Sequence, residues 1–237
     1  MPQIHLGEFE ADVVFKDIKN VHLSVHPPEG RVRVSAPTRM DLDTIRVFTI
    51  SKLGWIKSQR RKMQSQVRET PREFLDRESH YVWGSRVLLS CVEQSGRLGV
   101  KVSASRLTVF TKPNSNRIDR ERLLSAWYRQ QTREAAAPLI ANWEKVLDVS
   151  VSKIFVQKMK TRWGSCNPTR RTIRLNTELA KKPPDCLDYV VLHEMLHLLE
   201  PTHNARFKSL LTRHMPNWQT RRDALNRLPI RHEQWKQ

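Results

Sequence analysis

The sequence predicts an α+β protein in which a buried C-terminal helix packs on an antiparallel or mixed sheet, preceded by a β-rich N-terminal lobe with a basic helix. Strand-like alternation of apolar and polar residues fills much of residues 1–115, whereas helical spacing dominates residues 116–237. The loop "KPNSN" separates these parts, so we place the boundary between the two lobes after residue 115. No internal repeat is evident.

The N-terminal lobe begins with short segments typical of strands. In "RVRVS", Val32 and Val34 alternate with Arg31 and Arg33, which predicts a half-solvated antiparallel strand. Residues 41–66 then carry apolar side chains at roughly helical spacing, and an aspartate at its start is well placed as a cap. Residues 81–112 predict three or four further strands separated by glycine-containing turns.

Positive charge is the unusual feature of the composition. The chain has 42 Lys and Arg against 24 Asp and Glu, a net charge of +18. The region Lys52–Arg72 is the strongest basic patch, and a polyanionic partner such as nucleic acid, docked through Arg60, Arg61 and Lys62, is one hypothesis for it, although a solvated face is the slightly favoured explanation. Such a face would belong to an ordinary basic protein, and the sequence leaves both open.

Cysteine usage and hydropathy predict a cytoplasmic protein. The three cysteines are far apart, which argues against a disulfide framework or a cysteine-built zinc site and favours a reducing compartment. No apolar run approaches the roughly 20 residues that cross a bilayer. The first residues also lack the basic start and apolar centre of a secretory signal. We therefore expect no membrane association.

The C-terminal lobe is predicted to contain a long helix over residues 117–147, which Pro138 is positioned to kink. Two adjoining strands follow, in "SKIFVQKMK" and "TIRLNTEL". Asp185 is then well placed as the N-cap of a helix whose positions 187–199 are nearly all apolar. Because this helix has no polar face, we expect it to lie inside the protein.

The buried helix carries the motif H-E-x-x-H. His193 and His197 are four residues apart, so their side chains lie one turn apart on the same face and can reach one ion. Glu194 projects beside them, where it can hydrogen-bond a water on the metal. Buried imidazole and carboxylate groups need partners, and a metal ion supplies one. The alternative, a pair of hydrogen-bonded core histidines, explains the spacing less well.

A catalytic zinc ion usually takes three protein ligands and one water molecule. His203 is the leading third ligand, because Pro201 should end the helix and let the chain turn back toward the ion. Glu200 is one competitor, either as a ligand or as a hydrogen-bond partner of one. His214 and Glu233 are the others.

These residues carry a family resemblance. The pattern H-E-x-x-H-x-x-x-x-x-H followed by "NARF" resembles the YgjP-like family of zinc metallopeptidases, which is related to the SprT-like and WLM zincins. The upstream run from "KTRWGSC" to "LHEMLHL", the downstream "HMPNW", and the N-terminal "LSVHPPEGRVRVSAP" and "KLGWIKSQ" are similar to that family too. The resemblance covers about residues 21–228 and implies a zincin-like catalytic lobe.

The resemblance also implies roles for individual residues. His193, His197 and His203 are expected to bind Zn²⁺, and Glu194 is expected to be the catalytic acid and base. The segments "RWGSC" and "LN" are expected in strands beside the active-site helix. The favoured role of these segments is to hold a turn and a contact between strands; the alternative is that Trp163, Ser165 or Asn176 contacts the substrate.

The function that these expectations favour is a zinc-dependent hydrolase, specifically a metallopeptidase using a zinc-activated water with Glu194 as general base. Two other classes stay open. One is a metal-dependent phosphohydrolase that acts on nucleotides. The other is a nucleic-acid-associated protease docked through its basic surface. The sequence specifies neither the substrate nor the oligomeric state.

Overall fold

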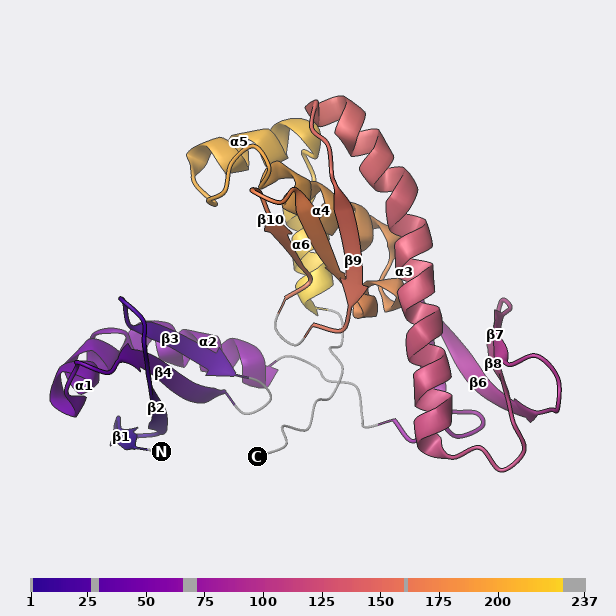
Figure 1. Cartoon of the computed structure of the whole chain (residues 1–237), viewed down its shortest axis with the longest axis horizontal. Helices are drawn as coiled ribbons and strands as arrows, with labels where there is room; N and C mark the ends of the chain where they lie inside the picture. Colours follow the sequence, from indigo (N-terminus) through magenta and orange to yellow (C-terminus); the bar gives the residue numbers. More distant parts are fainter. Residues whose placement is uncertain (1, 27–29, 66–71, 160–161, 228–237) are drawn as a thin grey trace. The chain divides into compact units, whose positions relative to one another are not determined.

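The computed structural model of the chain describes residues 2–26, 30–65, 72–159 and 162–227, and it confirms the α+β class (Figure 1). These residues form two compact units, one within residues 1–71 and one within 72–228. The predicted lobe boundary after residue 115 thus lies inside the second unit.

The first unit is a four-stranded sheet with two helices packed on it. Its elements are β1 (Gln3–His5), β2 (Glu10–Lys16), β3 (His22–His26), β4 (Arg31–Pro37), α1 (Leu42–Ser51) and α2 (Leu53–Ser65). Val32 and Val34 are buried as predicted, and Ile45 and Ile56 of the helices pack against them. The strand is not purely antiparallel, however, because β4 pairs in parallel with β2 and antiparallel with β3.

The second unit begins with another four-stranded sheet, with β5 (Ser79–Val82), β6 (Ser85–Glu93), β7 (Gly99–Val102) and β8 (Arg106–Thr111). Its strand order is β5-β6-β8-β7 with β6 and β8 parallel, which repeats the order β1-β2-β4-β3 of the first unit and its parallel central pair. No repeat is evident in the sequence, but the strand order of the two sheets is the same. The same strand pairing can arise from different residues, because the core of a sheet requires only that apolar residues alternate along each strand.

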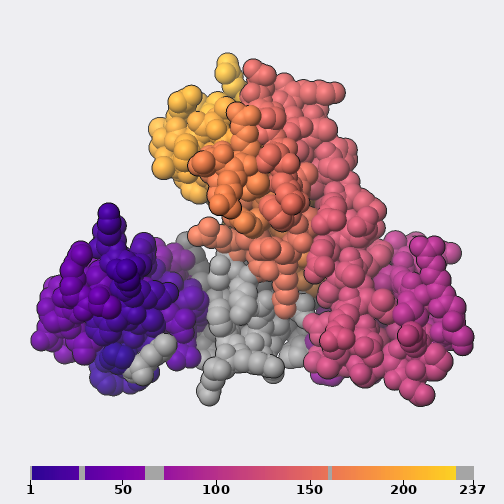
Figure 2. Space-filling model, in the orientation of Figure 1, coloured from indigo at the N-terminus to yellow at the C-terminus, as the bar shows by residue number. Residues whose placement is uncertain are grey.

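The long helix α3 (Arg117–Leu147) has the bounds that the sequence predicted, and it continues past Pro138. From Leu124 to Ile140, a buried residue recurs at every fourth position of the helix. Leu124 and Tyr128 belong to the hydrophobic core under the β5–β8 sheet, whereas Ala136 and Ile140 belong to the core of the C-terminal part of the unit. The helix therefore joins both parts into one unit, and its exposed side forms a long flank of the surface (Figure 2).

The rest of the second unit packs helices on a three-stranded sheet of order β10-β11-β9. The strands are β9 (Lys153–Gln157), β10 (Gly164–Asn167) and β11 (Thr172–Asn176). A short 3₁₀ helix, η1 (Thr177–Lys181), leads into α4 (Pro184–Leu196), α5 (Ala205–His214) and α6 (Trp218–Arg227). The end of "RWGSC" lies in β10 and "LN" lies in β11. These two strands pair with each other and contact α4, as the resemblance implied. Among the described residues, no helix has the length and apolar character that a membrane span requires.

Candidate active site

Helix α4 carries the motif, and its first turn explains how it starts. Pro183 is the cap residue and Pro184 the first helical residue, where the missing N–H costs nothing. The prediction that Asp185 caps the helix was wrong: Asp185 lies inside the first turn and forms an ion pair with Arg221 at 3.7 Å. From Cys186 onward almost every side chain is buried, as the apolar sequence predicted.

Asp188 fixes α4 against two other helices. Its Oδ1 accepts a hydrogen bond from Nε1 of Trp143 on α3 at 2.8 Å, and its Oδ2 accepts one from Nη1 of Arg221 on α6 at 2.6 Å. The Asp188 side chain is partly buried and accepts a hydrogen bond on each carboxylate oxygen, which restricts its position. The helix that bears the motif therefore has a fixed position relative to α6, which forms one wall of the cavity described below.

The three predicted histidine ligands lie together. One nitrogen from each of His193, His197 and His203 lies within 4.8 Å of the others, and Nε2 of His193 is 2.9 Å from Nε2 of His203. Burial, followed by the charges of the other two histidines, lowers the pKa of His193 to about 3. Burial also lowers the pKa of His203. Neutral imidazole is the form that binds metals, so this arrangement suits a cation.

The turn after α4 brings His203 back as predicted. Asn204 then caps α5, because its Oδ1 accepts a hydrogen bond from the backbone N–H of Phe207 at 3.0 Å. The Phe207 ring is 2% exposed and lies 4.7–5.0 Å, centroid to centroid, from all three imidazole rings. Phe207 thus supports the whole histidine cluster from one side.

The geometry gives Glu200 a role other than that of a ligand. Its backbone carbonyl lies 3.1 Å from Nδ1 of His197, and its carboxylate accepts a hydrogen bond from Oγ1 of Thr202 at 3.0 Å. Because the Glu200 carbonyl contacts Nδ1 of His197, the other ring nitrogen, Nε2, can face the other two histidines. Within the part of the chain that the structure describes, neither Glu200 nor His214 belongs to the metal-binding group. Glu233 lies outside the described residues.

Glu194 lies beside the histidines and is 6% exposed. Burial raises the pKa of this carboxyl to about 8, and the positive charge of Arg162 opposes the shift. The backbone of Gly164 in β10 lies close to this carboxyl group: a Cβ on Gly164 would lie 2.6 Å from Oε1 of Glu194. Burial and the nearby Glu194 also raise the pKa of Cys166 to about 11, so this cysteine is a thiol near neutral pH.

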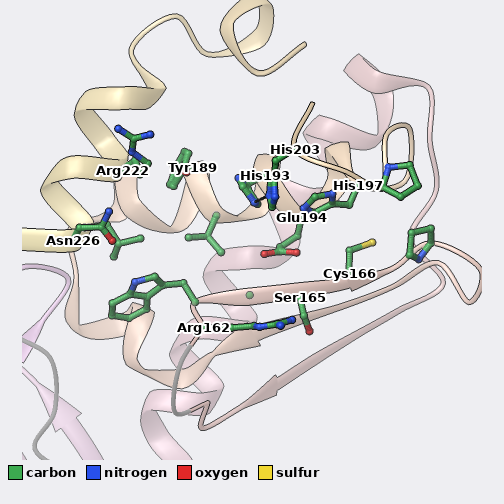
Figure 3. A pocket seen from close by; sticks show the side chains of 16 residues that line it. Arg162, Ser165, Cys166, Tyr189, His193, Glu194, His197, His203, Arg222 and Asn226 are labelled. Carbon is green, nitrogen blue, oxygen red and sulfur yellow. Dashed lines mark hydrogen bonds between the residues drawn. The ribbon is translucent and has the colours of Figure 1, made fainter. Parts of the chain in front are cut away.

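A cavity of about 600 Å³ opens over these groups (Figure 3). Residues of β10 and the segment before it form one side, residues of α4 the floor, and residues of α6 the far end. Trp163 and Ser165, two of the three candidate substrate contacts, are among its lining residues, together with His193, Glu194 and His197.

A family model described as YgjP-like, metallopeptidase domain, matches residues 19–228. The chain belongs to the YgjP-like family. This membership confirms the resemblance that the motifs indicated, and it makes the chain a hydrolase of the metallopeptidase class. The class implies a bound metal ion, and the three clustered imidazoles are a donor set that fits one.

Two solved structures resemble parts of this YgjP-like chain. The crystal structure of the metallopeptidase zymogen abylysin from Pyrococcus abyssi matches 38% of this chain and 90% of its own, at 17% identity and a TM-score of 0.36. The zymogen jannalysin from Methanocaldococcus jannaschii matches 40% of this chain and 86% of its own, at 18% identity and a TM-score of 0.33. None of the curated proteins matches the chain.

Asn176 is the third candidate substrate contact, and the structure places it elsewhere. It is 4% exposed and does not line the cavity. Its Nδ2 donates to the backbone carbonyls of Met159 and Arg162 at 2.9 and 2.8 Å, and its Oδ1 accepts from the N–H of Glu178 at 3.2 Å. In this YgjP-like domain, Asn176 at the end of β11 is hydrogen-bonded to the backbone at Met159 and at Arg162.

The predicted nucleic-acid contacts lie on α2 in the first unit. The guanidinium of Arg60 lies 4.5 Å from the centre of the Phe9 ring, so part of this side chain packs within the unit. Arg61 is exposed, and the side chain of Lys62 lies outside the described atoms. Nucleic-acid binding by this helix stays a prediction.

Sequence reasoning missed four side chains of this YgjP-like site. Phe207 packs against the three histidines, and Tyr189, Arg222 and Asn226 line the cavity. Tyr189 had a usable signal, because it lies one helical turn before His193 on the same face. The α6 residues had none, since the chain spacing says nothing about where a separate helix docks.

Proposed function

We propose that this YgjP-like chain is a zinc-dependent peptidase. The observation that carries the proposal is the placement of a three-imidazole cluster and a buried carboxyl, Glu194, in one cavity. Three neutral nitrogen donors with room for a further ligand are typical of catalytic zinc sites. Zinc held by His193, His197 and His203 would supply a Lewis acid that lowers the pKa of a coordinated water to about 7.

Glu194 is the group that moves the proton. A general base works best when its pKa lies near the working pH, and burial raises the pKa of Glu194 to about 8 in the absence of a cation. A nearby dication stabilises the carboxylate form, which can then accept a proton from the attacking water. The same Glu194 oxygen returns this proton to the nitrogen of the departing amine, so the residue acts as base and then as acid.

The sheet edge explains why a peptide suits the cavity. Strand β10 is at the edge of the β10-β11-β9 sheet, and Gly164, Ser165 and Cys166 line the cavity. The free edge of such a strand can pair with an extended peptide through backbone hydrogen bonds. We infer that the substrate lies along this edge, with Trp163 and Ser165 in contact with it.

Metal analysis combined with a hydrolase screen tests the proposal. The purified chain should hold about one zinc ion and cleave unstructured peptides, and removal of the metal by a chelator should abolish cleavage until zinc is restored. His193→Ala should lose zinc, and His214→Ala is the matched control, because His214 lies outside the metal-binding group. Hydrolysis of nucleoside triphosphates without any peptide cleavage would refute the peptidase proposal.

A further inference from the structure

One end of the cavity is built from side chains that the catalytic mechanism does not use. This end lies where α6 faces the first half of α4, and Figure 3 shows Arg222 and Asn226 beside Tyr189, away from Cys166 and His197. Its lining residues are Tyr189, Val190, Arg222, Leu225 and Asn226. The end of the cavity therefore combines two apolar walls with three polar side chains that can donate hydrogen bonds.

Arg222 is held in place although it is partly exposed. Its guanidinium lies 5.0 Å from the centre of the Trp218 ring. Its Nε and Nη2 both donate to the same oxygen of Asp223, at 3.1 and 3.0 Å. Those bonds do not use Nη1, and 43% of the side chain is accessible. A guanidinium fixed in this way can bind an anion without a large loss of side-chain entropy.

The charges around the cavity favour an anionic substrate. Arg162 and Arg222 are the positively charged side chains among the described lining residues, and Glu194 is the one acidic side chain among them. Asp223, the ion-pair partner of Arg222, does not line the cavity and offsets part of the charge of Arg222. Glu194 is needed for the proton transfer, so it does not bind a substrate cation at the α6 end. A lysine or arginine of a substrate would meet Arg222 as a like charge, which is unfavourable in a partly desolvated site.

We propose that the α6 end of the cavity is a subsite for a carboxylate of the peptide substrate, selected by Arg222 with help from Asn226 and Tyr189. A carboxylate accepts charge-assisted hydrogen bonds from guanidinium, and an amide and a phenol add neutral ones. Val190 and Leu225 suit the methylene groups of a glutamate side chain. A C-terminal carboxylate offers the same chemistry. The inference rests on the proposed peptidase function and names its substrate class.

The test compares three alanine-based peptide sets: amidated peptides with one Glu, the same peptides with Gln, and Glu-free peptides with a free C-terminus. Mass spectrometry locates the cleavage sites. The wild-type protein should cleave the preferred carboxylate peptide roughly tenfold to a hundredfold faster in kcat/KM than its neutral counterpart. Arg222→Gln should reduce this ratio to about one, because the carboxylate peptide loses its advantage over the neutral peptide.

Arg213→Gln is the matched control, because Arg213 is an exposed α5 residue outside the cavity lining and its loss changes the net charge equally. This variant should keep the wild-type ratio. An Arg222→Gln ratio equal to that of the wild type would overturn the subsite, and so would a wild-type ratio of about one. Faster cleavage of the free-acid set than of the amidated Glu set would assign the subsite to the chain terminus.

A binding measurement separates this inference from the peptidase proposal. Fluorescence anisotropy with labelled Glu and Gln peptides, on metal-free protein, should show tighter binding of the Glu peptide, and Arg222→Gln should abolish the difference. Selective binding without cleavage of any peptide would support the subsite and refute the peptidase. Cleavage without selectivity in either measurement would refute the subsite and leave the peptidase standing.

Discussion

Gly164 faces Glu194 so closely that a β-carbon on the glycine would lie 2.6 Å from Oε1 and 2.7 Å from Cγ of the glutamate. The contact joins the edge strand β10 to the motif helix α4. Because the backbone of Gly164 does not need the left-handed region, the missing side chain serves to make room for the carboxyl group. The first prediction follows from this contact.

Gly164→Ala should displace the Glu194 carboxyl and leave the fold intact, since a side chain can move more easily than two packed elements. We expect kcat/KM to fall roughly 100-fold, because small misplacements of a catalytic group have effects of this size. Zinc content and melting temperature should stay close to wild type. Gly99→Ala is the control, as a Cβ at Gly99 has open space around it. Wild-type activity of Gly164→Ala would contradict the close packing described above.

Phe207→Ala should weaken both the fold and the metal site. The ring is buried against all three histidines, and truncating a buried phenylalanine costs roughly 3–5 kcal/mol of unfolding free energy. The imidazoles lose their common support, so zinc should transfer to a competing chelator faster than from the wild type. Phe207→Leu should lie between the two. A destabilised variant that keeps the wild-type rate of zinc transfer would show that Phe207 does not position the ligands.

Asn176→Ala should destabilise the second unit by roughly 1–3 kcal/mol, because it leaves the part-buried backbone carbonyls of Met159 and Arg162 without the Nδ2 donor. The segment before Trp163 loosens, so activity should fall as well. Thermal unfolding and steady-state kinetics on the same preparation distinguish the two interpretations of this residue. A variant with unchanged stability and a raised KM would restore Asn176 to the substrate contacts.

In the first unit, the ion pair between the buried Asp12 and the exposed Arg31 predicts a dependence of stability on pH. A hydrogen bond from Arg31, at 2.6 Å, and a second one from Gln3 lower the pKa of Asp12, whose side chain is 4% exposed. A carboxyl with a lower pKa in the folded state stabilises the fold above its unfolded pKa of about 3.9. This contribution is lost as the pH falls below that value toward the folded pKa.

Hydrogen exchange of the β2 and β4 amides, corrected for the intrinsic rate at each pH, measures this loss between pH 6 and pH 3. Asp12→Asn should lower protection at pH 6 by roughly 1–3 kcal/mol and flatten the decline toward acid. The same decline in the variant as in the wild type would place the pH dependence on other groups.

Helix α3 and the grouping of the three histidines could be predicted from the sequence, because local patterns determine them. Apolar spacing located α3 to its end residues, and the four-residue separation of His193 and His197 placed both on one helix face. The return of His203 to the other two histidines was also predicted, but α4 ends at Leu196, ahead of Pro201. The role of Glu200 was not, because its backbone carbonyl rather than its carboxylate contacts His197.

Features that depend on contacts between residues far apart in the chain could not be predicted from the sequence. The division into units depends on α3 packing with the β5–β8 sheet, and the loop at 112–116 gave no sign of this contact. The repeated strand order was hidden for the same reason. Arg222 reaches the cavity because α6 docks through Arg221 on Asp188, a contact between residues 33 positions apart. The structural role of Asn176 became evident only from its hydrogen bonds to the backbone.

The most direct test of the account is the zinc content and peptidase activity of Glu194→Gln, measured on one preparation. Glutamine keeps the shape of the side chain and cannot take up the proton, while the three histidines are unchanged. We predict about one zinc ion per chain, as in the wild type, and a loss of hydrolysis of at least roughly 100-fold. A Glu194→Gln protein that binds zinc and retains wild-type peptidase activity would contradict the proposed mechanism.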